Sequence, residues 1–443
     1  MDELCKDMEE EITYLEDASV EINYTKYWKI LKQRITNAAK QREKKIKYME
    51  NGRKNALNGY LELAIERIER GENAWDDYKR IRKELSILWQ GKIQRKLDNL
   101  KSNKIEDNMY DIHKLQKQKK YENKGKITEL SIDEKVYTGT EQILEGLQGK
   151  LTEDLGQGSQ LNDENPTQEE RKFLEFLPKL DLTDEEMQKV LGPVSEEECE
   201  EIFKEVDLDS SPGKDGITYR MMRHLFRHKV FYKTLFLNVI EWTRYNQDMG
   251  HLKDVAVMKL LNKKKPTVKY EGKRKLTLNN KDASFVGKIW TNRFSKVILT
   301  KILPKQQFIC QDDLNIVDEN IEIRDVVSHL RGDIDGREKD GTVVAIDYKD
   351  AFRSTYHRWI KLVLEHVEIP GPFKNWFWAM YEDFSLIVTL NGQKTGRIRQ
   401  LRGLAEGHSA SMPVFALAVS PILVAIENTI EGIVTFDGKR PKS

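Results

Sequence analysis

The chain has 443 residues and a mass of 51.9 kDa, which is long enough for two or three domains with at least one sizeable hydrophobic core. Its 74 Lys and Arg residues almost balance its 73 Asp and Glu residues, so net charge does not indicate nucleic-acid binding and only local clusters could support it. Charged residues make up 33% of the chain, a share that predicts extended helix or solvated linker beside the core.

The cysteines and the apolar runs argue against zinc-binding, disulfide-bonded, membrane and secreted proteins. Cys5, Cys199 and Cys310 lie far apart without paired spacing, which argues against a zinc site or a disulfide framework and favours a reducing compartment. No apolar run approaches the roughly twenty residues that span a bilayer, and residues 1–17 are acidic where a signal peptide would be basic and then apolar. We therefore expect an intracellular protein of the nucleus or cytoplasm, without a membrane partner.

Residues 1–125 are predicted to form a charged helical region. Between residues 24 and 120 apolar residues recur at helical spacing without a proline, which predicts two or three long amphipathic helices. The charged runs 40–55 and 114–126 favour a solvated helix face over a phosphate-binding one. Binding of RNA or of a protein partner by this region stays open.

Residues 126–205 are predicted to contain a linker and acidic helices. Residues 126–132 have an extended pattern, residues 140–155 a helical one, and the polar stretch 156–170 is the best candidate linker. Acidic helices follow, and Ser195 with Glu198 three residues later predicts a capping box.

From residue 206 the pattern is that of a mixed α+β domain. Turn residues lead into a helix at 210–226, and Asn391-Gly392 supplies the turn of a predicted hairpin at 385–400. The other predicted elements are strands at 255–261 and 341–347 and helices at 286–303, 357–367, 372–381 and 411–430.

The strand at 341–347 ends on a carboxylate. Asp347 falls at its carboxyl end, where an open sheet meets its ligands, and a buried carboxylate is costly unless a cation neutralises it. Mg²⁺ is commonly held by one or two carboxylates together with substrate phosphates. A helix-capping aspartate is an equally good interpretation of this stretch alone.

A second candidate segment precedes the apolar helix at 411–430. Arg402, Gly403 and Gly407 come just before it, with Ser409 and Ser411 as predicted caps. Glycines let a ligand approach the backbone closely, and a helix N-terminus favours an anion. Taken alone, the segment is better explained as a glycine-rich turn.

Five blocks in order resemble the reverse transcriptase of non-LTR (LINE-type) retrotransposons, at residues 210–225, 257–298, 343–352, 373–392 and 402–423. The resemblance covers residues from about 195 to 440. It implies the fingers and partial palm of a right-hand polymerase at 206–443. Such a domain adds deoxynucleotides (dNTPs) to a DNA primer 3′ end on an RNA template, with two Mg²⁺ ions.

The resemblance also implies roles for single residues. Asp347 falls on the catalytic aspartate that binds both metal ions. Asp350, Ala351 and Phe352 fall on the nucleotide-binding segment, where the Phe352 ring would exclude a 2′-hydroxyl. The remaining positions are the cationic triphosphate residues Lys263 and Arg274, and the loop that cradles template and incoming base, Arg402, Gly403, Glu406 and Gly407.

Three positions depart from the family pattern. Glu406 replaces the usual glutamine, and its carboxylate should repel a triphosphate and template. Lys275 replaces the proline of the usual Arg-Pro-Ile, and Arg353 follows Ala-Phe where many members carry aspartate.

The family's second metal-binding element, an aromatic-x-Asp-Asp hairpin, does not occur before Ser443. The acidic pair Asp312-Asp313 lies upstream of Asp347 in a polar stretch and is interpreted as a solvated turn or helix cap. We therefore expect a polymerase domain that is incomplete at its C-terminus and is inactive or weak on its own. The alternative is a non-enzymatic RNA- or protein-binding remnant of such an element.

Overall fold

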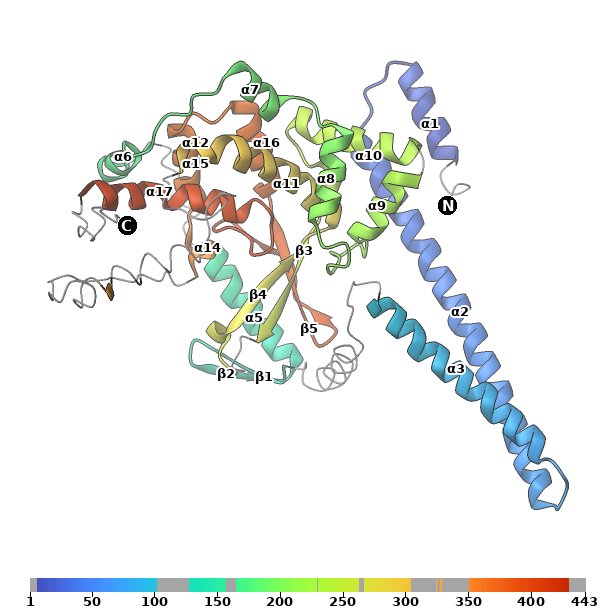
Figure 1. Ribbon diagram of the computed structural model, residues 1–443. Helices are drawn as coiled ribbons and strands as arrows, with labels where there is room; N and C mark the ends of the chain where they lie inside the picture. The colour runs from blue at the N-terminus through green and yellow to red at the C-terminus, as the bar shows by residue number, and fades with distance from the viewer. Residues whose placement is uncertain are drawn as a thin grey trace. The chain divides into compact units, whose positions relative to one another are not determined.

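The structure, a computed structural model, describes residues 6–101, 127–156, 165–228, 230–262, 267–303, 324, 327–328 and 350–429 (Figure 1). It divides into two compact units. Unit 1 comprises residues 1–7 and 30–127, and unit 2 comprises residues 8–29 and 128–443.

Unit 1 contains a helical hairpin of α2 (Tyr24–Glu69), from residue 30 onward, and α3 (Trp75–Lys101). Gly71 turns the chain between them with φ of 81°, and its N–H donates to the Ile68 carbonyl at 2.9 Å. The helices pack through Leu57, Ala64 and Ile81. The predicted long amphipathic helices are confirmed over this range.

Unit 2 contains a five-stranded mixed sheet. Its order is β4-β3-β5-β6, and β7 also pairs with β5. β3 pairs antiparallel with β4 and parallel with β5, which is antiparallel to β6 and β7. The bounds are β3 (Ala256–Asn262), β4 (Lys273–Leu278), β5 (Ser385–Leu390), β6 (Gln393–Lys394) and β7 (Ile398–Arg399).

Helices make up most of the rest of the described chain, so the chain has a mostly helical fold of the predicted α+β class (Figure 1). The described helices outside the hairpin are α1 (Lys6–Asp17), α5 (Thr140–Gly156), α6 (Gln168–Leu174), α7 (Asp184–Leu191), α8 (Glu196–Glu205), α9 (Tyr219–His228), α10 (Val230–Asn246), η2 (Gly250–Leu252), η3 (Tyr270–Gly272), α11 (Lys281–Arg293), η4 (Phe294–Leu299), α12 (Thr300–Ile302), α14 (Ala351–Ser354), α15 (His357–His366), α16 (Gly371–Tyr381) and α17 (Ser411–Thr429). No helix of the described part of the chain is long and apolar enough to cross a membrane.

Aromatic side chains fill the core of unit 2. Trp290 is fully buried, and its ring stacks on Phe294 at 4.6 Å and on Phe373 at 4.8 Å between centroids. Its indole N–H donates to the Phe373 carbonyl at 3.0 Å, which satisfies the polar atom of a buried tryptophan. These contacts hold α11 to α16, which precedes β5 in the chain.

The structure corrects three sequence predictions. The predicted linker 156–170 is wrong at its end, because Thr167 and Glu170 form a complete capping box that starts α6. Sequence analysis also missed β2 (Lys135–Thr138), the partner of β1 (Glu129–Ile132). The predicted helix 286–303 is present, but its residues Phe294–Leu299 form a π-helical segment, η4.

Most other predicted elements of the described residues are confirmed, including the strand at 255–261 and the hairpin with left-handed Asn391 and Gly392 at φ of 50° and 87°. Only half of the predicted capping box is present: the Ser195 hydroxyl accepts from the Glu198 N–H at 3.2 Å, whereas the Glu198 carboxylate accepts from Arg293. Several of the residues and elements singled out in the sequence lie outside the described residues: Cys5, Lys263, Cys310, Asp312-Asp313, the strand at 341–347 with Asp347, and the last residues from 430 onward.

Candidate functional site

Strand β4 brings two lysines to the inner face of the sheet. Alternate residues of a strand point to opposite faces, and Lys273 and Lys275 are 6% and 2% exposed, whereas Arg274 between them is exposed. The Lys275 ammonium lies 4.1 Å from the Tyr270 ring centroid and 3.9 Å from Asp350 Oδ1. β4 therefore presents Lys275, and not the predicted Arg274, to the segment that carries Asp350.

Asp350 starts the short helix α14 in a strained backbone conformation. Its φ of 52° is in the left-handed region, which Asp tolerates better than most residues. Its carbonyl accepts from the Arg353 and Ser354 N–H groups, both at 2.9 Å. The turn places Asp350 Oδ1 2.7 Å from Arg353 Nη2.

Arg353 lies at the centre of a group of polar and charged side chains that we call the Arg353 cluster: Tyr270, Lys275, Asp350, Arg353 and Glu406. Tyr270, Lys275 and Arg353 are buried, Asp350 is exposed and Glu406 is half-buried. Arg353 is 7% exposed, donates to the Tyr270 hydroxyl at 3.1 Å, and has its Nε 3.9 Å from Glu406 Oε1. A buried guanidinium is tolerated only when such partners compensate its lost hydration. Its Nε forms no hydrogen bond with another described residue.

Burial shifts the pKa values of two residues of the Arg353 cluster, Lys275 and Tyr270. It lowers the pKa of Lys275 from 10.5 to about 8, with repulsion from Arg353 as the next cause, and Asp350 and Glu406 oppose the shift. Burial also raises the pKa of Tyr270 to about 12, so this phenol is neutral at physiological pH. The Lys275 charge is thus the one that responds to mildly alkaline pH.

The backbone of the loop at 402–407 forms hydrogen bonds to β4 and to Phe352, next to the Arg353 cluster. The Leu404 N–H donates to the Phe352 carbonyl at 2.7 Å, and the Glu406 carbonyl accepts from the Thr277 N–H at 2.9 Å. Gly403 and Gly407 have φ of 79° and 102°, in the left-handed region. An added Cβ would lie 2.6 Å from the Arg353 backbone or 2.5 Å from the Thr277 carbonyl, respectively, so only glycine fits at either position.

The remaining predicted site residues lie close to this loop. Arg402 places its guanidinium 4.7 Å from the Tyr356 ring centroid, in a cation–π contact. The Phe352 ring packs on Phe415 of α17 at 4.9 Å between centroids, and Ala351 begins α14 half-buried.

The predicted caps of α17 do not cap it. The Ser411 hydroxyl donates to the Ala405 carbonyl at 2.7 Å and lies 2.8 Å from the Tyr381 hydroxyl, so it ties the loop to the core. The Ser409 hydroxyl is buried without a hydrogen-bond partner among the described residues.

The described residues do not by themselves form a metal site. None of them belongs to a group of three or more His, Cys, Asp or Glu side chains that could hold one ion. Asp350 and Glu406, the two carboxylates of the Arg353 cluster, lie 2.7 and 3.9 Å from the Arg353 guanidinium, which a bound cation would have to displace. A magnesium site therefore depends on Asp347, which is outside the described residues.

The site residues predicted from the sequence do not include Tyr270, Lys275 or Arg353. The alternation of β4 gives a signal for Lys275, because "KRKLTL" puts lysines on one face and Arg274 on the other. Arg353 and Glu406 both depart from the family pattern, and their opposite charges are consistent with the 3.9 Å contact between their side chains. Nothing in the sequence marks Tyr270.

The fold and the site define a mixed α+β protein in which three distant segments meet at the partly buried Arg353 cluster. No protein-family model matches the chain. Over 259 residues it is 22% identical to the transposon TX1 uncharacterized 149 kDa protein of Xenopus laevis. This match covers 57% of the chain but only 19% of that protein's length. The chain is a distant relative of a transposon protein.

Proposed function

We propose that the chain carries the RNA-directed DNA polymerase domain of a non-LTR retrotransposon. Two findings support the proposal: the five sequence blocks occur in the order of that family, and the similar Xenopus protein is a transposon protein. In this proposal residues 206–443 are the fingers and part of the palm. Residues 126–205 link them to the charged helical region at 1–125.

The main structural support for the proposal is that three segments distant in the sequence meet at one place. β4, the Asp350 turn and the loop at 402–407 are far apart in the sequence, yet backbone bonds from Thr277 to Glu406 and from Leu404 to Phe352 join them. A nucleotide site needs such a meeting of a carboxylate-bearing turn, a basic strand and a loop whose backbone a ligand can approach.

In this proposal different residues of the chain bind the nucleotide, the metal ion and the template. Lys275 and Arg353 would attract the phosphates of a dNTP, and Phe352 would border its sugar. Asp347, with carboxylates from elsewhere, would hold Mg²⁺, which stabilises the charge that develops on the attacking 3′-oxygen and on the leaving pyrophosphate. Template and primer would be bound through their backbones by basic residues near β3 and β4.

A second candidate function has its own support. Arg353 already binds Asp350, and Glu406 adds a negative charge to the loop, so part of the nucleotide site is occupied by the chain's own ion pairs. This arrangement favours a remnant that binds RNA or protein without catalysis.

Primer extension distinguishes a polymerase domain from a non-catalytic remnant. We expect Mg²⁺-dependent incorporation of dNTPs on an RNA template, slow for this chain, and its loss in Asp347→Ala. Equal incorporation by both proteins would contradict the metal role of Asp347. Retention of RNA with no incorporation at any protein concentration would favour the remnant.

A further inference from the structure

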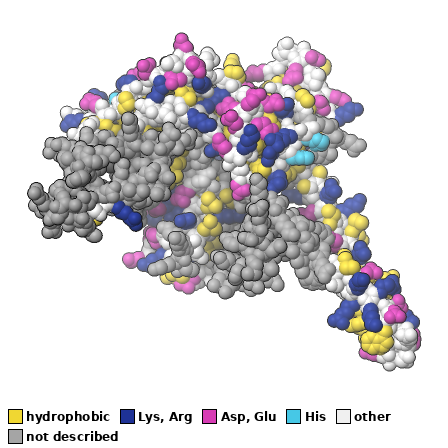
Figure 2. Space-filling view, in the orientation of Figure 1, with side chains coloured by type: hydrophobic (Ala, Val, Ile, Leu, Met, Phe, Trp, Pro, Cys, Tyr) yellow, Lys and Arg dark blue, Asp and Glu magenta, His cyan; other side chains and the backbone are white. Residues whose placement is uncertain are grey.

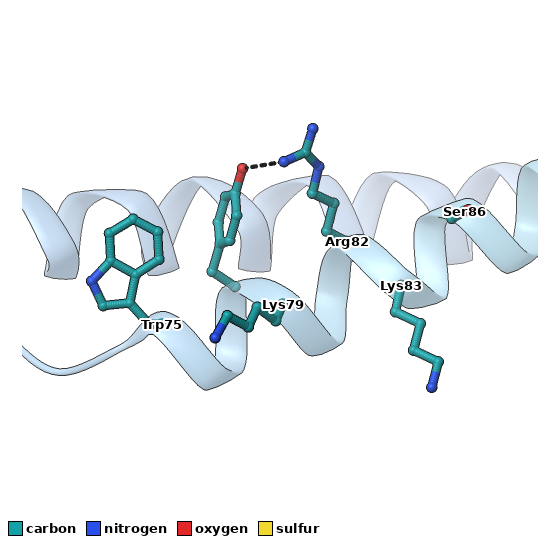
Figure 3. Close-up of a pocket in the computed structure, with 6 residues that line it drawn as sticks. Trp75, Lys79, Arg82, Lys83 and Ser86 are labelled. Atoms are coloured by element: carbon teal, nitrogen blue, oxygen red, sulfur yellow. Dashed lines mark hydrogen bonds between the residues drawn. The ribbon is translucent and has the colours of Figure 1, made fainter.

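The first turns of α3 carry a hollow that the proposed polymerase site does not use. Its volume is about 510 Å³, and six side chains of one helix face line it (Figure 3): Trp75, Tyr78, Lys79, Arg82, Lys83 and Ser86. Figure 2 shows hydrophobic and basic side chains interleaved over this hairpin. The whole hollow belongs to unit 1.

The aromatic end of the hollow is open to solvent. Trp75 is 54% exposed, and its ring meets Tyr78 edge-on, with centroids 5.9 Å apart and an interplanar angle of 78°. Arg82 donates to the Tyr78 hydroxyl at 3.0 Å and lies 5.7 Å from its ring centroid, which orients both side chains. An exposed indole beside a fixed tyrosine is a surface on which a flat ring can stack.

The basic end of the hollow is not neutralised. Neighbouring arginines are paired: Arg80 bonds Asp77 at 3.0 Å, and Arg53 lies 3.7 Å from Glu84. Within the described part of the chain, by contrast, Lys79, Arg82 and Lys83 have no carboxylate partner. The lining thus carries three positive charges and no negative one.

We propose that this hollow binds single-stranded nucleic acid, with a base stacked on Trp75 and the adjoining phosphates bound by Lys79, Arg82 and Lys83. Stacking aromatics beside basic side chains are the usual components of single-strand binding, because every base has a π-face and every linkage a negative charge. A duplex fits poorly, since its bases are already stacked on one another. The proposal does not rest on the polymerase function.

The test measures binding of a labelled single-stranded RNA or DNA to the full chain by fluorescence anisotropy, without Mg²⁺ or nucleotide. Trp75→Ala should weaken binding roughly five- to a hundredfold, the value of one stacked base. Lys79→Glu with Lys83→Glu should lower the affinity and reduce the slope of log K against log salt by about 1.4, or 0.7 per phosphate contact.

The matched control is Lys44→Glu with Lys54→Glu, which makes the same charge change at exposed positions of α2 outside the hollow. It should have a much smaller effect. A loss of affinity equal to that of the α3 pair, unchanged binding by Trp75→Ala, or an equal dependence of duplex binding on Trp75 would overturn the proposal. As a second readout, photocrosslinks from 4-thiouridine RNA should fall on the peptide that carries Trp75; crosslinks only elsewhere would also overturn it.

Discussion

Lys275 shows how burial sets the chemistry of a single residue. The strand hides its ammonium among Tyr270, Arg353 and Asp350, and burial brings its pKa down to about 8. Because the Lys275 pKa is lower in the folded state, between about pH 8 and 10.5 the lysine is protonated in the unfolded chain but largely neutral in the folded one. The free energy of unfolding therefore rises with pH over that window. Any attraction for phosphate is present below about pH 8 and is lost above it.

We therefore predict a pH-dependent affinity for dNTP. Binding should weaken by about tenfold or more as pH rises through 8, because a charge-assisted hydrogen bond contributes about 1.5–3 kcal/mol. Lys275→Met should bind weakly at every pH and remove the dependence. Arg274→Met, on the opposite face of β4, is the control and should keep the dependence. A titration that is unchanged in Lys275→Met would assign the pH effect to another group.

The Arg353–Glu406 pair gives a second prediction at the residue scale. The two side chains lie 3.9 Å apart, and Glu406 is 35% exposed, whereas Asp350 at 2.7 Å and the Tyr270 hydroxyl at 3.1 Å remain as partners of the buried guanidinium. Glu406 should therefore contribute little to stability. Glu406→Gln should leave the unfolding midpoint almost unchanged and tighten dNTP binding several-fold, because it removes a negative charge beside the guanidinium. Weaker binding by Glu406→Gln would show instead that the carboxylate contacts the ligand's metal or base.

At the scale of elements, the loop at 402–407 depends on close backbone approach. Gly407 has φ of 102°, and an added Cβ would lie 2.5 Å from the Thr277 carbonyl on β4. Gly407→Ala should lower the free energy of unfolding by about 1–3 kcal/mol and loosen the Arg353 cluster. The control is Gly149→Ala inside α5, where a Cβ meets nothing within 4 Å. It should stabilise by about 0.5–1 kcal/mol. Similar effects of both substitutions would contradict this account of the loop.

The elements themselves were largely predictable from sequence, and their meeting points were not. Periodicity identified the amphipathic helix at 357–366, and Asn391-Gly392 identified its hairpin, because these signals are local. The parallel pairing of Ala256 with Leu386 joins residues far apart in the chain, and nothing local specifies it. For the same reason sequence analysis placed Arg353 and Glu406 separately, and left Tyr270 unmarked.

At the scale of the molecule, one tryptophan at the start of α2 packs within unit 2 against residues that are distant in the sequence. Trp28 is 1% exposed, its ring lies 5.0 Å from that of Phe236, and its indole N–H donates to Asp282 Oδ2 at 2.9 Å across 254 residues of sequence. Trp28→Ala should cost about 3–5 kcal/mol, visible as a lower urea midpoint, and Trp28→Phe should cost about 1–3 kcal/mol for the lost hydrogen bond. The exposed Trp75→Ala is the control, and an equal loss in that variant would contradict the assignment.

The central claim, that this chain holds a dNTP through Mg²⁺ at Asp347, is tested most directly by equilibrium binding. Mg²⁺ and dTTP would be offered to the chain in the presence of an RNA template with a DNA primer, and the affinity compared with that of Asp347→Ala and with that for the ribonucleotide UTP. We predict Mg²⁺-dependent binding of dTTP that is about tenfold or more tighter than in the variant, equivalent to about 1.4 kcal/mol, and tighter than for UTP. Equal dTTP affinity of the two proteins, with and without Mg²⁺, would contradict the claim.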